Sequence, residues 1–150
     1  MNLKALMGSG HKIVLFMLPF LLLGLALNVK RPALFRIRGP RALKVLSAII
    51  LILGVTGWIW SVALILTRVP KRRLITTGPY AVVKHPLYTD IAFLVLPWVG
   101  LLLGSWLGVP LGIVRYVGSR LFSPQEERLL SETFGASWDE YRRRVKIAWL

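Results

Sequence analysis

The stretch VLSAIILILGVTGWIWSVALILT, residues 45–67, decides the fold, because it runs without a charged side chain from Lys44 to Arg68. An α-helix of this length measures about 35 Å at ~1.5 Å per residue, whereas the hydrocarbon core of a bilayer is ~30 Å thick. The stretch therefore predicts a transmembrane helix. The mean hydropathy of the whole chain, +0.63, agrees with a membrane-embedded domain.

On the N-terminal side, residues 13–29 (IVLFMLPFLLLGLALNV) form a second apolar run, at the short limit for crossing a bilayer. A signal peptide is the competing interpretation, because Lys4 and Lys12 precede the run. The run is longer than a usual signal-peptide core, and no small-residue cleavage site follows it before Lys30. We therefore expect a retained first transmembrane helix.

On the C-terminal side, residues 87–122 form a third apolar region, which would be about 54 Å long as one straight helix. A bilayer needs far less, so we expect a break at Gly104-Ser105 and a tight helical hairpin whose ends share one side of the membrane. Four glycines recur every four residues in this region: Gly100, Gly104, Gly108 and Gly112. They indicate either close helix approach or a hairpin that is only loosened near its prolines.

The last segment, residues 124–147, has the pattern of an amphipathic helix that lies on a membrane surface or caps the bundle. Gly135 is a possible interruption of that helix. Its apolar stripe consists of Leu130, Phe134, Trp138, Tyr141 and Val145. Together these elements predict an all-α, multi-pass membrane helix bundle with about four transmembrane helices, forming one domain over residues 1–150.

The charges are strongly biased, with 20 Lys and Arg against six Asp and Glu. The basic residues lie between apolar runs and form no continuous basic face, which favours contact with membrane lipid phosphates over a nucleic-acid partner. The absence of cysteine excludes disulfides, thiolate catalysis and Cys metal sites, and we predict no metal site.

The expected hairpin places segment 68–86, the C-terminal tail and the N-terminus on one side of the membrane. That side carries most of the Lys and Arg, so we expect it to be cytoplasmic. The loop 30–44 on the opposite side is also basic, and it opposes this orientation.

Two polar clusters flank the expected hairpin, namely TGPYAVVKHPLY at 77–88 and SPQEER at 123–128. Closure of the hairpin would bring them together. Each has a structural explanation, since Gly78-Pro79 suits a turn and His85-Pro86 suits the residue before a helix. Ser123-Pro124-Gln125-Glu126 reads as a capping box, which accounts for Glu126 but leaves Glu127 unexplained.

The string LITTGPYAVVKHPLYTD (74–90), followed by EERLLSETFGASWDEYRRRV (126–145), resembles the isoprenylcysteine carboxyl methyltransferase family and its phospholipid methyltransferase relatives. The shared pattern is Gly-Pro-Tyr, Arg-His-Pro-x-Tyr, Glu-Glu, Phe-Gly and two spaced tyrosines. This chain departs from it with Lys84 in place of Arg, Asp90 in place of Gly and Trp138 in place of the first spaced Tyr. Lys84 lacks the planar fork with which arginine binds a carboxylate.

The resemblance implies a methyltransferase that uses S-adenosylmethionine and takes residues 68–150 as its cofactor-binding catalytic part, after two N-terminal transmembrane helices in 1–67. It implies catalytic roles for Lys84, His85 and Glu127. It also implies the following cofactor-binding residues: Gly78, Tyr80, His85, Tyr88, Arg120, Glu126 and Glu127. Methyl transfer from a sulfonium chiefly requires donor and acceptor to be aligned and kept dry.

Two other functions remain open at this stage. One is an NADPH-dependent membrane reductase resembling the sterol reductases, and the other is a non-catalytic membrane adaptor. For a methyltransferase, the acceptor is also open: a prenylcysteine carboxylate or prenylated substrate, an amine-bearing lipid headgroup and another lipophilic small molecule all fit. The sequence leaves the oligomeric state open as well.

Overall fold

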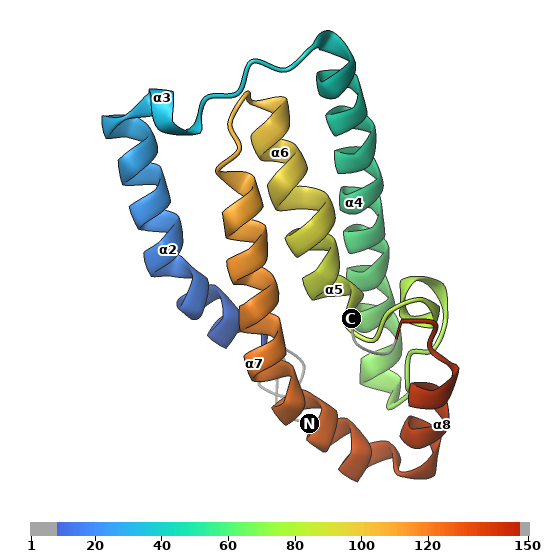
Figure 1. Cartoon of the computed structure of the whole chain (residues 1–150). Helices are drawn as coiled ribbons and strands as arrows, with labels where there is room; N and C mark the ends of the chain where they lie inside the picture. Colours follow the sequence, from blue (N-terminus) through green and yellow to red (C-terminus); the bar gives the residue numbers. More distant parts are fainter. Residues whose placement is uncertain (1–8, 148–150) are drawn as a thin grey trace.

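The computed structural model describes residues 9–147, and this part of the chain is helical and has no β-strand (Figure 1). The long helices are connected by short helical turns and loops. In chain order the elements are α2 (Gly10–Lys30), α3 (Pro32–Phe35), α4 (Arg41–Arg68), η1 (Val69–Lys71), η2 (Gly78–Ala81), α5 (Pro86–Thr89), the π-helical η3 (Asp90–Val95), α6 (Leu96–Leu102), α7 (Gly108–Phe134) and α8 (Ala136–Arg144).

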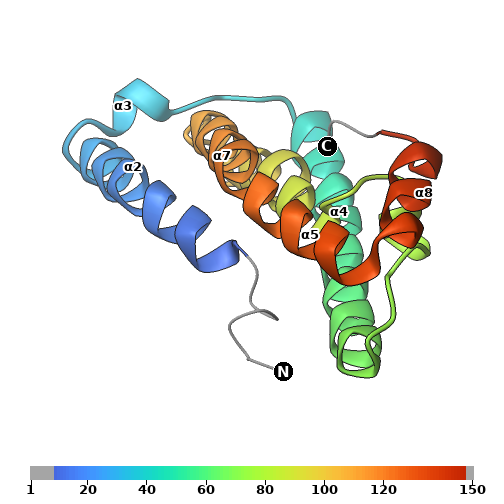
Figure 2. The same cartoon turned by 90° about the horizontal axis from the view of Figure 1, so that it is seen from below.

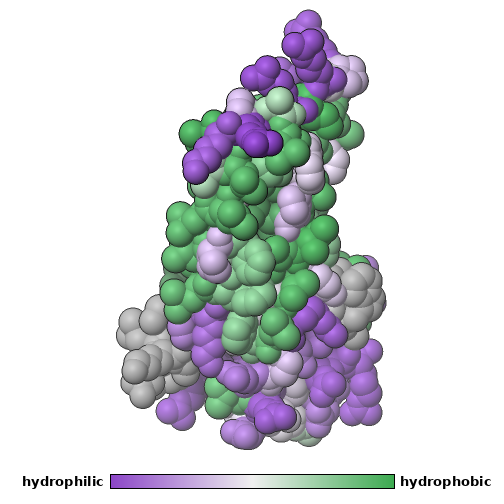
Figure 3. Space-filling model, turned by 60° about the vertical axis from the view of Figure 1, so that its left-hand side comes forward, coloured by the Kyte–Doolittle hydropathy of each residue, from purple (hydrophilic) through white to green (hydrophobic). Residues whose placement is uncertain are grey.

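Two of these helical stretches are long and apolar enough to cross a membrane, α2 and the continuous run Arg41–Lys71 that begins with α4. They contain the two runs for which the sequence predicts spans. Their apolar side chains are mostly exposed, as Leu15 at 65% and Ile52 at 64% illustrate. Figure 3 shows apolar residues covering the middle of one face and hydrophilic residues at both ends. Exposed apolar surface of this extent is typical of contact with lipid.

Four helical segments, which we call arms, lie side by side: α2, α7, the segment that ends with α6, and α4, in this order (Figures 1 and 2). Helix α2 packs on α7, α7 packs on α6, and both η3 and α6 pack on α4. The chain reverses direction between α6 and α7, at residues 103–107, where Gly104 has a φ of +74°. Backbone hydrogen bonds from Ile37 to Gly104 (2.8 Å) and from Trp106 to Phe35 (3.0 Å) attach this turn to the connection between α2 and α4.

The glycines of this region allow close helix approach. A Cβ on Gly108 would lie 1.9 Å from the carbonyl oxygen of Leu96, and one on Gly112 would lie 2.3 Å from that of Ala92. A Cβ on Gly100 would lie 2.8 Å from the carbonyl oxygen of Ser105. The backbones therefore approach too closely for any side chain at these positions, which favours close packing over simple loosening.

The capping box predicted at Ser123 is wrong. Helix α7 continues through Pro124 and ends only at Phe134, so Ser123 is a buried position within the helix and caps no N-terminus. The local sequence of a capping box resembles that of a helix interior in which the proline merely lacks a hydrogen-bond donor. Gly135, with a φ of +51°, ends α7, as the sequence suggested.

The predicted apolar stripe is confirmed as a packed cluster, although two helices share it. Trp138, Tyr141 and Val145 are buried there, and three further side chains pack against them: Leu74, Leu130 and Phe134. Because Leu74 lies in the connection that follows α4, the stripe attaches α8 to the rest of the protein. The stripe therefore joins the end of α7, α8 and the connection after α4.

Candidate functional site

The two polar clusters meet at the end of the bundle where α5 begins. The Nζ of Lys84 lies 2.7 Å from Oε1 of Glu127, and the Nε2 of His85 lies 3.1 Å from the same oxygen. Lys84 and His85 precede α5, whereas Glu127 lies on α7, more than 40 residues further along the chain. The convergence expected from the sequence is therefore present in the structure.

His85 is placed by the start of a helix. It precedes Pro86, the first residue of α5, with a φ of −124° and a ψ of 62°, and its carbonyl oxygen accepts bonds from the amides of Tyr88 and Thr89. A residue before a helix-starting proline is kept out of the helical conformation, as His85 is here. The imidazole is directed at Glu127 on α7, so the start of α5 positions the His85 side chain.

Tyr88 connects the second glutamate to the same cluster. Its side chain is only 4% exposed, its hydroxyl donates to Oε2 of Glu126 at 3.0 Å, and its ring stacks on His85 at 5.7 Å between centroids. The amide of Ser9, just before α2, lies 3.5 Å from the same Glu126 oxygen. The start of α2 therefore lies next to Glu126.

The charge of Glu127 is strongly stabilised. The hydrogen bond from His85 is the main cause that lowers the pKa of this carboxyl to about 2, and Lys84 adds to the effect while burial opposes it. Two donors on one carboxylate oxygen favour the ionised form. Glu127 is therefore an anion throughout the physiological pH range, and it holds Lys84 and His85 in place.

Gly78 and Tyr80 lie one loop away, in η2. Gly78 has a φ of +64° and its Cα faces the ring of Trp60 on α4, so a side chain there would be strained and crowded. The carbonyl oxygen of Tyr80 accepts a 2.8 Å bond from the hydroxyl of Tyr141 on α8. Burial raises the pKa of both tyrosines, with a further contribution from Glu126 for Tyr80, so both hydroxyls stay protonated.

Arg120, the remaining residue inferred from the resemblance, occupies an exposed position on α7. The side-chain contacts between the region around His85 and the two glutamates of α7 are made by five predicted residues: Lys84, His85, Tyr88, Glu126 and Glu127. Among the described residues, no group of three His, Asp or Glu side chains could hold a metal ion.

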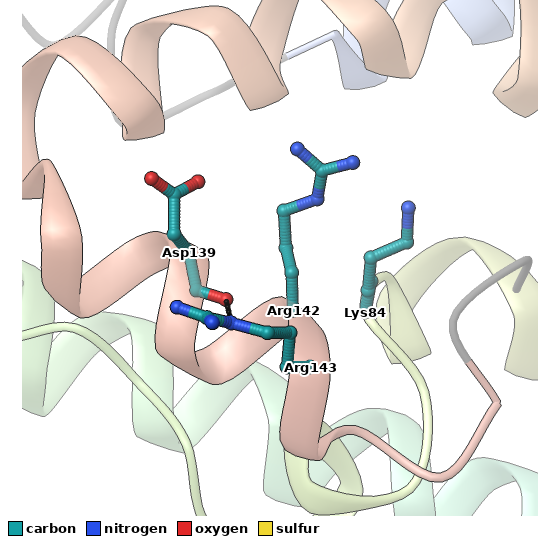
Figure 4. Close-up of a pocket in the computed structure, with 4 residues that line it drawn as sticks. All are labelled: Lys84, Asp139, Arg142 and Arg143. Carbon is teal, nitrogen blue, oxygen red and sulfur yellow. Dashed lines mark hydrogen bonds between the residues drawn. The ribbon is translucent and has the colours of Figure 1, made fainter.

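A cavity of about 300 Å³ adjoins this cluster and is lined by Lys84, Asp139, Arg142 and Arg143. Figure 4 shows the side chains of Lys84, Arg142 and Asp139 extending towards one open space, while Arg143 donates from Nε to the carbonyl oxygen of Asp139 at 3.3 Å. The volume is at the lower end of the range of small-molecule sites. Lys84 belongs to both the cluster and the cavity.

Sequence reasoning missed the contribution of α8 and that of Arg115. In α8, Arg142 and Arg143 belong to the basic residues for which the charge pattern predicts contact with lipid phosphates, and in the structure both line the cavity. Arg115 is 5% exposed and its guanidinium carbon lies 5.5 Å from the centroid of the Tyr88 ring. A lone arginine within an otherwise apolar region was the available signal.

Comparison with known proteins gives one match. The model of the isoprenylcysteine carboxyl methyltransferase (ICMT) family matches residues 42–132, from the first turn of α4 almost to the end of α7. The matched region contains Lys84, His85, Tyr88, Glu126 and Glu127. No curated protein and no solved structure matched the chain. The family match favours neither a reductase nor an adaptor.

Proposed function

The chain belongs to the isoprenylcysteine carboxyl methyltransferase family, and from this premise we propose that it methylates a lipophilic acceptor with S-adenosylmethionine as donor. The observation that carries the proposal is the double contact of Glu127 with Lys84 and His85. This contact joins the two halves of the family motif beside a polar cavity.

The residues present fit the polar groups of S-adenosylmethionine. Its amino group and ribose hydroxyls need acceptors, and three carboxylates are near: Glu126, Glu127 and Asp139. Its carboxylate needs a donor, and Arg142 and Lys84 extend into the cavity. We assign the amino-acid end of the cofactor to this cavity and propose that Tyr88 and Tyr80 form walls of the adjoining site. Arg120 stays a possible further contact.

S-adenosylmethionine supplies a methyl group already activated by a positive sulfur. The chain's task is then to align the two reactants and to exclude water. Glu127 orients His85 and Lys84, and Tyr88 orients Glu126. The positive charge of Lys84, 2.7 Å from Glu127, is available to an anionic group of the cofactor or the acceptor.

The proposed membrane arrangement has four spans: α2, α4, the arm from α5 to α6, and the first part of α7. The site lies at one end of these spans, which we propose faces the cytoplasm. The acceptor would enter laterally from the lipid, because exposed apolar side chains cover the arms next to the site. The acceptor would be a prenylcysteine carboxylate, an amine-bearing lipid headgroup or another amphiphile.

Calorimetry on the detergent-purified full chain tests the cofactor. We expect S-adenosylmethionine to bind the wild type and Glu127→Gln to bind at least 10-fold more weakly, because the neutral amide no longer pairs with Lys84 and His85. Glu132→Gln, at an exposed position of the same helix, is the matched control and should bind like the wild type. Absence of binding by the wild type, or unchanged affinity of Glu127→Gln, would contradict the proposal.

The acceptor is tested with a radiolabelled methyl donor and a panel of prenylcysteines, amine-bearing lipids and other amphiphiles. A methyl ester releases methanol in base whereas an N-methyl group does not, so base treatment of the product separates O- from N-methylation. If the protein binds the donor but labels no class of amphiphile, the proposal of a lipophilic acceptor is wrong.

A further inference from the structure

Arg115 is a buried cation that the proposed function does not use. It lies on α7, within the stretch proposed to cross the membrane, and only 5% of the residue is exposed. Among the described residues it has no carboxylate within ion-pair distance, and its Nε is enclosed without a hydrogen-bond acceptor. A cation in such surroundings is costly unless something compensates its lost hydration.

The Tyr88 ring is the partner that the structure provides. The guanidinium carbon of Arg115 lies over this ring, 5.5 Å from its centroid. That distance is within the range of a cation–π contact, and such contacts are strongest when water is excluded, as it is around a ring only 4% exposed. The Tyr88 ring therefore compensates the buried charge of Arg115, and Arg115 in turn helps to fix the position of that ring.

Tyr88 in turn positions the site. Its hydroxyl donates to Glu126 at 3.0 Å and its ring stacks on His85, which contacts Glu127. A change in the ring's position would move a glutamate acceptor and an imidazole together. A chain of contacts thus runs from Arg115 in the apolar part of α7 to the two glutamates at its polar end.

We propose that Arg115 is a positioning residue for the cofactor site, which acts through the Tyr88 ring on Glu126 and His85. The inference rests on the proposed function, because it assumes that these groups bind S-adenosylmethionine. It assigns no contact between Arg115 and the reactants. Its signature is therefore a change in cofactor affinity without a matching change in the KM of the acceptor.

The first test compares two substitutions by calorimetry on the detergent-purified full chain. Arg115→Met removes the charge and should weaken S-adenosylmethionine binding about 10-fold, whereas Arg115→Lys keeps a cation near the ring and should stay within about 3-fold of the wild type. Arg128→Met, at an exposed position of α7, is the control and should have no effect. If Arg115→Met fails to fold, Arg115→Gln removes the charge with a polar side chain.

The second test is a double-mutant cycle of thermal stability without ligand, with Arg115→Met, Tyr88→Leu and the pair. Contact between the two side chains predicts that their effects are not additive. Additive stability effects, an unchanged cofactor affinity in Arg115→Met, or an increased acceptor KM at unchanged cofactor affinity would each overturn the inference. Failure of the wild type to bind the cofactor would instead refute the proposed function. The double-mutant cycle would still test the contact between Arg115 and Tyr88 in that case, because it is measured without ligand.

Discussion

At the scale of the residue, the central feature is one carboxylate oxygen that contacts two nitrogen-bearing side chains. Oε1 of Glu127 is shared by Lys84 and His85, and Glu126 is used separately by Tyr88. The two adjacent acids therefore have different roles. Glu127 holds the residues before α5 against α7, whereas Glu126 ties Tyr88 and the start of α2 to the same helix. Lys84 stands where the family pattern has arginine, and its contact with a single oxygen of Glu127 needs no planar fork.

The lowered pKa of Glu127 predicts how stability depends on pH. Folding lowers this pKa from 4.5 to about 2, so the folded protein holds the ionised form more strongly than the unfolded chain does. The resulting stabilisation is fully present above the unfolded value and is lost as the pH falls from about 5 towards 2. We expect wild-type thermal stability to fall more steeply over this range than that of Glu127→Gln.

The measurement is thermal unfolding of the detergent-purified proteins at a series of pH values. Glu132→Gln, with its carboxyl at an exposed position, should keep the wild-type pH dependence. Parallel curves for the wild type and Glu127→Gln would show that the contacts of the Glu127 carboxylate contribute nothing to folding.

At the scale of the element, the arm that ends with α6 and the arm formed by α7 approach closely because both contain glycines at their contact. The Cβ of an alanine at position 108 would lie 1.9 Å from a backbone carbonyl oxygen, which cannot rotate away as a side chain can. We expect Gly108→Ala to force the arms apart and to destabilise the protein by about 1–3 kcal/mol, the usual range for overpacking.

Gly10→Ala is the control for this substitution, because a Cβ there would make ordinary contacts of 4.0 Å with Tyr88. Thermal or denaturant unfolding in detergent should separate the two variants. A Gly108→Ala protein as stable as the control would mean that the arms can separate at little cost.

The sequence predicts elements well where a signal is carried by many residues. Hydropathy alone locates α2 and α4, and the length of the third apolar region requires a break near Gly104. The signals failed where they are local, because Ser123, Pro124 and Glu126 can start a helix or continue one, and only packing decides. Arg115 was missed for a related reason, since its role depends on Tyr88, a residue distant in sequence.

The candidate site, too, could be predicted only where the overall course of the chain determines which residues meet. His85 and Glu127 could be selected as a pair because a chain that folds back must bring the two clusters together. The cavity residues Asp139 and Arg142 could not be selected, because their direction depends on how Gly135 turns α8 after α7.

At the scale of the whole molecule, the apolar middle and the polar ends of Figure 3 define how the protein would sit in a membrane, but not which end faces the cytoplasm. The end with the site carries Lys84, Arg128 and the basic run of α8, and the opposite end carries the basic loop 30–44. The rule that positive loops stay in the cytoplasm favours the end with the larger number of Lys and Arg, which is the site end.

Single-cysteine variants can decide the orientation, because the chain contains no cysteine and needs no background substitution. Arg38→Cys lies in the connection between α2 and α4, and Glu132→Cys lies near the end of α7; both positions are exposed. In intact cells, a membrane-impermeant maleimide should label the first variant, and it should label the second only after permeabilisation. The reverse pattern would place the site outside the cytoplasm, and labelling of both variants in intact cells would refute four spans.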